Sequence, residues 1–148
     1  MSTLFAFLHH LFAFTLVAAL AVELVLIHQD LTVESARRLL RADAVLGVSA
    51  GLLLIVGVSR MIWFEKGIDY YTMSYPFLVK LGVFLGLAVM SLMPTVEFLS
   101  WRQALRAGQL PVVDERRRRK IQATIHGELM GIVVILLCAA MAARGGWV

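Results

Sequence analysis

Residues Leu4 to Ile27 read LFAFLHHLFAFTLVAALAVELVLI, an apolar run that carries a single carboxylate, Glu23. A helix needs about 20 mostly apolar residues to cross the hydrocarbon core of a bilayer, and this run is long enough. Three later runs also qualify, namely Ala42 to Phe64, Phe77 to Leu99, and Ala123 to Ala143. The sequence therefore predicts an all-α integral membrane protein, a four-helix bundle.

The composition agrees with this class. Of 148 residues, 60% are hydrophobic and 16% charged, which leaves too little polar surface for a soluble domain of this size. The four spans use most of the chain, so we expect one domain over residues 1–148. Although Ala19-Leu20-Ala21 resembles a weak cleavage site, no Lys or Arg precedes the first run, and we expect that run to be a retained span. Cys138 is the one cysteine, so no disulfide framework is expected.

Basic residues are divided unequally between the two sides of the predicted bundle. The connections after spans one and three hold Arg37, Arg38, Arg41, Arg102, Arg106, Arg116, Arg117, Arg118, Arg119 and Lys120. The other side has Arg60, Lys66, Lys80 and Arg144. Because cytoplasmic loops are rich in Lys and Arg, this predicts that both termini lie outside the cytoplasm.

Local signals set the expected helix ends. Pro76 suits the start of a helix, and Gly108 with Pro111 predicts that the third helix continues to about Ala107 before it stops. Asp114 is a plausible N-cap for a long fourth helix. The segment His28 to Arg41 mixes leucines with charges, so we expect a short amphipathic piece at the cytoplasmic interface between the first two helices.

Three spans contain a Gly-x-x-x-Gly motif: Gly47 to Gly51, Gly82 to Gly86, and Gly127 to Gly131. Such glycines let helices approach closely, which predicts a compact bundle, although they could also leave room for a flat cofactor. The basic run Arg116 to Lys120 has the composition of a nucleic-acid or anionic-lipid contact. We interpret it as a topology determinant that touches lipid headgroups, and we expect no nucleic-acid partner.

Ionisable residues inside the spans are costly in lipid and usually mark function or face the bundle interior. With the predicted topology, one set falls in the outer leaflet: His9, His10, Arg60 and Lys80. A second set falls in the inner leaflet, with His28 at its edge: Glu23, Asp43, Glu97, His126 and Glu128. Each set also has an interpretation without a functional site. Interfacial histidines are often solvated, the long side chains of Lys and Arg can reach the headgroups, and Asp43 could be a helix N-terminal charge.

The functional interpretation of each set follows from its chemistry. Imidazoles are neutral ligands for haem iron or another transition metal, and Arg60 and Lys80 could hold an anionic edge. The phase of the helix places His9, rather than His10, on the face of Glu23. The inner set offers metal ligands from Glu23, Glu97, His126 and Glu128, or a relay of protons. Carboxylates buried together would repel one another unless a cation, a protonated His126 or protonation relieved them.

The order of these residues resembles a known family. A His near the outer end of span one, the stretches Val22 to His28 and Ile125 to Glu128, and Phe77-Leu78-Val79-Lys80-Leu81-Gly82 are similar to the HemJ-type protoporphyrinogen oxidases and the related CopD-like four-helix membrane proteins. The chain resembles still more closely a bacterial family of predicted membrane proteins of unknown function. The HemJ resemblance implies a haem-associated oxidoreductase of the bacterial inner membrane, in which His10 and Lys80 serve porphyrin oxidation.

The leading interpretation is thus a haem-binding redox protein. In it His9 or His10 ligates haem b, Lys80 and Arg60 hold the anionic edge, and a quinone or another membrane carrier accepts electrons. The second interpretation is a non-haem metal-binding or proton-handling protein built on the inner set. The third is an accessory subunit without chemistry, and in each case we expect a homo-oligomer or a subunit of a membrane complex.

Overall fold

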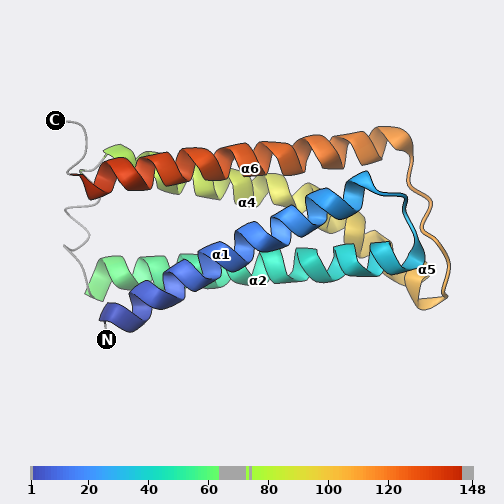
Figure 1. The fold of residues 1–148 in the computed structure, drawn as a ribbon, viewed down its shortest axis with the longest axis horizontal. Coiled ribbons are helices and arrows are strands. Elements are labelled where there is room, and N and C mark those ends of the chain that lie inside the picture. The colour runs from blue at the N-terminus through green and yellow to red at the C-terminus, as the bar shows by residue number, and fades with distance from the viewer. Residues whose placement is uncertain (1, 64–72, 74, 145–148) are drawn as a thin grey trace.

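The computed structural model describes residues 2–63, 73 and 75–144, and within them all regular structure is helical. The elements are α1 (Ser2–His28), α2 (Val33–Trp63), α4 (Tyr75–Ser100), the short α5 (Arg102–Arg106) and α6 (Glu115–Ala143). Figure 1 shows the four long helices side by side in one elongated bundle. All four are long and apolar enough to cross a membrane, which confirms the predicted fold class. The predicted end of span two at Phe64, and Lys66, lie outside the described residues.

The bundle consists of two closely packed helix pairs. α1 packs most extensively on α2, and α4 on α6, whereas α1 meets α6 and α2 meets α4 over smaller areas. Among the described residues α1 and α4 make no such contact, so they lie diagonally across the bundle. We call the end that holds α5 the arginine end. There α1 ends and both α2 and α6 begin (Figure 1).

The amphipathic segment expected between the first two helices is not a separate element. Only residues 29–32 are outside a helix, and from Val33 onward the segment forms the first turns of α2. Thr32 and Ser35 explain this early start. The Ser35 N–H donates to Thr32 Oγ1 at 3.0 Å, and the Thr32 N–H donates to Ser35 Oγ at 2.8 Å. This reciprocal exchange satisfies backbone donors at the helix start, as a capping box does.

The other helix ends follow the local signals closely. Pro76 lies in the first turn of α4, as predicted. The expected extension of that helix to Ala107 is interrupted at Trp101, after which α5 continues to Arg106. Gly108 ends this region with a φ of 70°, a backbone conformation that favours glycine. α6 begins one residue after Asp114, whose carbonyl accepts a hydrogen bond from the Arg118 N–H at 3.0 Å.

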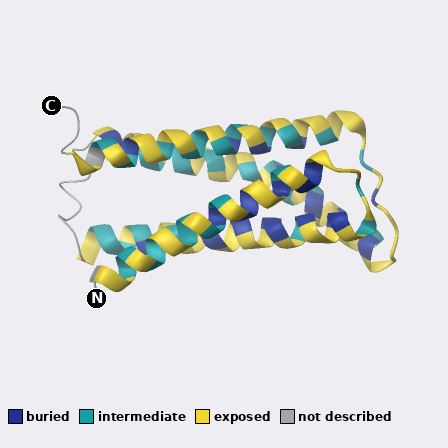
Figure 2. Ribbon diagram, in the orientation of Figure 1, coloured by how far each residue is buried: buried dark blue, intermediate teal, exposed yellow. Residues whose placement is uncertain are grey.

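Burial is concentrated near the arginine end, where the loops and α5 close the bundle (Figure 2). The largest fully buried side chains are Phe98, Leu20, Leu39, Ile121, Ile125, Glu23 and Pro94. Phe98 also makes an edge contact with Trp101, with ring centroids 5.0 Å apart. Large apolar side chains elsewhere on the helices are exposed, as expected where lipid tails surround a bundle.

The glycine motifs do not share one role. Gly127 and Gly131 lie where α6 meets α4, and a Cβ at these positions would come within 3.2 Å of Met90 and 2.6 Å of Leu87. Gly47, Gly51, Gly82 and Gly86 are exposed, and a Cβ added to any of them would meet nothing within 4 Å. Close packing within the chain is therefore confirmed for the motif of α6 and wrong for the other two.

Gly131→Val should destabilise the protein because its added methyl groups must enter space filled by Leu87. Overpacking of this kind costs about 1–3 kcal/mol. Gly86→Val is the matched control, since it makes the same change in an open helix position. Thermal unfolding in detergent should show a clear loss for the first variant only, and equal melting of the two would contradict the assigned helix contact.

Candidate functional site: a buried acid cluster

Three carboxylates from three helices lie inside the bundle. Glu23 of α1 is 1% exposed, Glu128 of α6 is 4% exposed, and Asp43 of α2 is 6% exposed. They are close enough to interact electrostatically, Glu23 with both of the others and Glu128 with Asp43. We call these three residues the acid cluster. It joins the two helix pairs, because Glu23 and Asp43 belong to one and Glu128 to the other.

The helical pattern explains why these polar groups are buried. Glu23 lies on the inward stripe of α1, whose buried members are Leu16, Ala19, Leu20, Glu23, Leu26 and Ile27. Asp43 holds the equivalent place on α2, among Leu39, Ala42 and Leu46. Residues three and four apart share a helix face, so the apolar neighbours carry the acids inward with them. The interpretation of Asp43 as a helix N-terminal charge is wrong, because α2 begins ten residues earlier, at Val33.

The hydrogen bonding within the acid cluster is unequal. Thr95 Oγ1 of α4 donates to Asp43 Oδ1 at 2.7 Å, so all four long helices contribute to the site. Both carboxylate oxygens of Glu23 and both of Glu128 are buried and make no hydrogen bond within the described part of the chain. A buried polar group without a partner is costly, and such groups need an explanation in function or in bound water.

A small cavity of about 50 Å³ adjoins the cluster and is lined by all four long helices. Among the described residues, Glu128 and Ser91 are the polar members of its lining. The apolar lining consists of Leu16, Leu20, Leu46, Ala50, Phe84, Leu87, Ala88, Ile132 and Ile135. A cavity needs about 10–15 Å³ of this volume for one water, so the space beside Glu128 is large enough for water.

Of the four predicted metal ligands, only Glu23 and Glu128 come together; Glu97 and His126 lie elsewhere. Glu97 lies at the arginine end, where Arg117 Nη1 is 3.5 Å from its Oε1 and the indole N–H of Trp101 donates to the same oxygen at 3.4 Å. His126 is exposed; its Nδ1 donates to the Gln122 carbonyl, and its ring meets that of His28 edge-on at 5.6 Å. Among the described residues, no three His, Cys, Asp or Glu side chains are placed to hold a metal ion.

The predicted outer set is also divided. The ring of His9 is half-buried and packs on Gly57 of α2, where a Cβ would be 3.4 Å from His9 Cε1. His10 is exposed, and its Nδ1 donates to the Ala6 carbonyl at 2.7 Å. The structure therefore turns His9 inward, as the helical phase predicts. Arg60 is half-buried one turn beyond Gly57, whereas Lys80 is half-buried on α4, the helix diagonal to α1.

Two features could not be found from the sequence, one in the acid cluster and one at the arginine end. Thr95 follows Pro94 in an apolar helix, and its contact with Asp43 spans 52 residues of sequence, so nothing local indicates it. The grouping of Arg37, Arg41, Arg102 and Arg106 around one pocket also depends on the placement of α5 beside α2. The sequence shows that Arg37 and Arg41 are one helical turn apart, as are Arg102 and Arg106. It does not show that these two pairs lie around the same pocket.

A family model described as Predicted membrane protein (DUF2214) matches residues 1–146. No curated protein and no solved structure matches the chain.

Proposed function

The chain belongs to this family of predicted membrane proteins, and we propose that it handles protons within the bilayer through Glu23, Asp43 and Glu128. One observation carries the proposal. Glu23 and Glu128 bury both carboxylate oxygens without a hydrogen-bond partner in the described structure, on helices of different pairs. Ionisable groups at such positions in membrane proteins mark ion pathways and proton relays.

The donor set favours protons over a metal ion. The predicted nitrogen ligand, His126, points away from the acid cluster, and Glu97 is engaged by Arg117. A proton needs no preformed coordination sphere, only carboxyl groups that can pass it to a neighbour or to water. Asp43 is oriented by Thr95, while the carboxyl groups of Glu23 and Glu128 make no competing protein hydrogen bond in the described residues.

The cavity beside Glu128 supports a direction for such transfer. It extends from the acid cluster along the bundle axis away from the arginine end, between residues such as Ala50 and Ile135. Water there would continue the chain of carboxyl groups, and the apolar lining would limit leakage. The path thus consists of the three carboxyl groups of the acid cluster, followed by a cavity whose lining is mostly apolar.

Flux measurements on proteoliposomes test the proposal. The vesicles contain a pH-sensitive dye, and a potassium diffusion potential makes their interior negative. Vesicles with wild-type protein should then acidify faster inside than protein-free vesicles. Glu128→Gln should return the rate to background, because an amide cannot take up and release a proton near neutral pH as a carboxyl group does. Glu34→Gln is the matched control, since Glu34 is an exposed acid paired with Arg38. A wild-type rate equal to that of empty vesicles, or an unaffected Glu128→Gln rate, would overturn the proposal.

We propose that the protein lies in a bacterial inner membrane with both termini outside the cytoplasm. The support is the imbalance of Lys and Arg, which gather at the arginine end. An alkaline phosphatase fused after Val148 should be active, and a fluorescent protein fused there should stay dark. The reverse result would place the arginine end outside.

A haem-binding redox function is the second candidate, favoured by the inward turn of His9. Gly57, on which His9 packs, lies three residues from Arg60 and on the same face of α2, so an imidazole and a cation come together there. Lys80 would have to act from the diagonal helix α4. Protein expressed with ample haem should show a Soret band that His9→Ala removes and His10→Ala leaves. The absence of a Soret band in the wild type would end this candidate, together with its quinone acceptor.

A further inference from the structure

We propose that the pocket between α2 and α5 binds the headgroup of an anionic lipid that carries two phosphates. Four arginines line this pocket: Arg37 and Arg41 from α2, and Arg102 and Arg106 from α5. Its volume is about 460 Å³, within the range of small-molecule sites. We call it the arginine pocket, and it is separate from the acid cluster.

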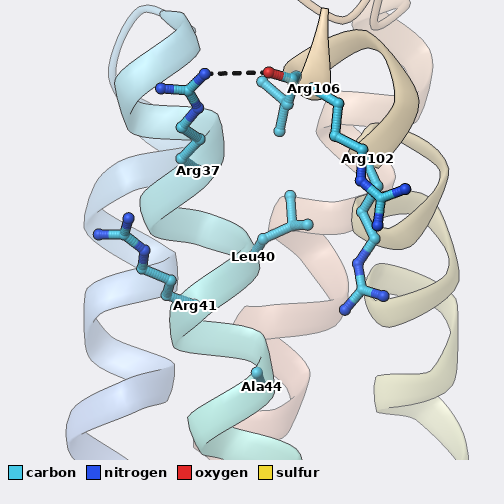
Figure 3. A pocket seen from close by; sticks show the side chains of 7 residues that line it. Arg37, Leu40, Arg41, Ala44, Arg102 and Arg106 are labelled. Carbon is cyan, nitrogen blue, oxygen red and sulfur yellow. Dashed lines mark hydrogen bonds between the residues drawn. The ribbon is translucent and has the colours of Figure 1, made fainter.

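The arginines form two pairs on two elements. Within each pair the residues are four apart, one helical turn, and Figure 3 shows the two pairs with Leu40 between them. Arg37 Nη2 donates to the Leu105 carbonyl at 3.1 Å, which ties α2 to α5 and fixes one edge of the pocket. The two arginine pairs therefore lie on different helices that border the pocket, one pair on α2 and the other on α5.

Positive charge in the arginine pocket is not compensated by the protein. Other arginines at this end pair with acids: Arg38 with Glu34 at 3.1 Å and Arg119 with Glu115 at 3.2 Å. Among the described residues, no acidic side chain lines the pocket or forms an ion pair with its arginines. Figure 3 shows Arg41 on the side of α2 away from Arg102 and Arg106, so the four arginines surround the pocket without converging on one point. Their summed positive charge at this end attracts anions.

The form of the pocket selects the kind of anion. A single guanidinium group can donate to two oxygens of one phosphate, so the arginines of α2 and those of α5 together offer enough donors for two phosphates. Leu40, Ala44 and Leu105 supply an apolar part of the lining beside the membrane-spanning helices, where acyl chains lie. Basic pockets between membrane helices are typical sites for cardiolipin-like headgroups. A soluble phosphate would use the arginines and leave the apolar part uncovered.

Native mass spectrometry of delipidated protein in detergent tests this proposal. Cardiolipin should bind more tightly than phosphatidylglycerol at equal phosphate concentration. Each arginine near an anionic lipid contributes about fivefold to binding, so Arg41→Gln with Arg106→Gln should weaken cardiolipin binding roughly thirtyfold. Arg38→Gln with Arg119→Gln is the matched control: it removes the same charge from the same end, outside the pocket, and should change binding less than threefold.

Three results would overturn the proposal. Equal binding of phosphatidylglycerol would remove the two-phosphate assignment, and equal weakening by the control variant would indicate general attraction to the surface. Inorganic pyrophosphate that binds as tightly as cardiolipin would show that a soluble phosphate, rather than a lipid, fills the pocket. Arg102→Gln alone provides a milder variant, with about fivefold weaker binding expected, if melting curves show that the double variant is unfolded.

Discussion

Arg118→Ala is expected to lower the unfolding free energy by about 2–4 kcal/mol, because hydrogen bonds from a charged donor contribute about 1.5–3 kcal/mol each. Arg118 Nε donates to the Ile27 carbonyl at 3.0 Å, and its Nη2 donates to the Gln29 carbonyl at 2.6 Å. The Ile27 carbonyl lies in the last turn of α1 and the Gln29 carbonyl one residue beyond the helix, where no further helical turn supplies donors. Gln122 Nε2 also donates to the Ile27 carbonyl, at 3.2 Å. The cation also opposes the negative end of the α1 dipole.

Arg119→Ala is the control for this prediction. Arg119 is the next residue in the same basic run, but it is exposed and pairs only with Glu115 one turn away. Such surface pairs contribute about 0.3–0.5 kcal/mol. Thermal unfolding of both variants in one detergent should separate them clearly. Equal losses would mean that the run acts through its total charge and not through the contact with α1.

Glu23→Gln is expected to abolish proton flux while leaving the melting temperature equal to or above that of the wild type. Glutamine keeps the shape of the side chain and replaces an ionisable group with a neutral one. The repulsion between Glu23 and its neighbours Asp43 and Glu128 is then removed. Flux assays and melting curves on the same preparation measure both effects.

Glu97→Gln separates this outcome from a metal site. Glu97 pairs with Arg117 outside the acid cluster, so its change should preserve flux and cost less than about 1 kcal/mol of stability. If Glu23→Gln instead lowered the melting temperature and released a bound metal ion, the site would be a metal centre and the proton proposal would fail.

The helices could be predicted from the sequence because membrane crossing imposes a length and composition that few other constraints disturb. Their ends were less predictable. The start of α2 depends on the reciprocal hydrogen bonds between Thr32 and Ser35. Without knowledge of these bonds, the charged residues that follow them resemble an interfacial segment. The interpretation of Asp43 is wrong for the same reason. The predicted span begins at Ala42, which places Asp43 at a helix start, whereas α2 begins at Val33.

Contacts between helices could not be predicted. The sequence offers three equivalent glycine motifs, but only Gly127 and Gly131 face a partner helix in the described structure. It also offers four consecutive arginines, and only the arrangement of α6 beside the end of α1 selects Arg118 for the carbonyls of Ile27 and Gln29. The inward turn of Glu23 was accessible through helical phase, whereas its neighbours on α2 and α6 required the packing.

The division into two helix pairs has a mechanical consequence. The contact within each pair is more extensive than the contact across the seam between the pairs, where α1 meets α6 and α2 meets α4. We therefore expect any relative movement of the helices to occur at this seam. Glu23 and Asp43 lie on one side of that seam and Glu128 on the other. Repulsion across the seam arises only when Glu128 and at least one of the other two acids are ionised together. We therefore expect the contact between the two helix pairs to be weakest when acids on both sides are charged.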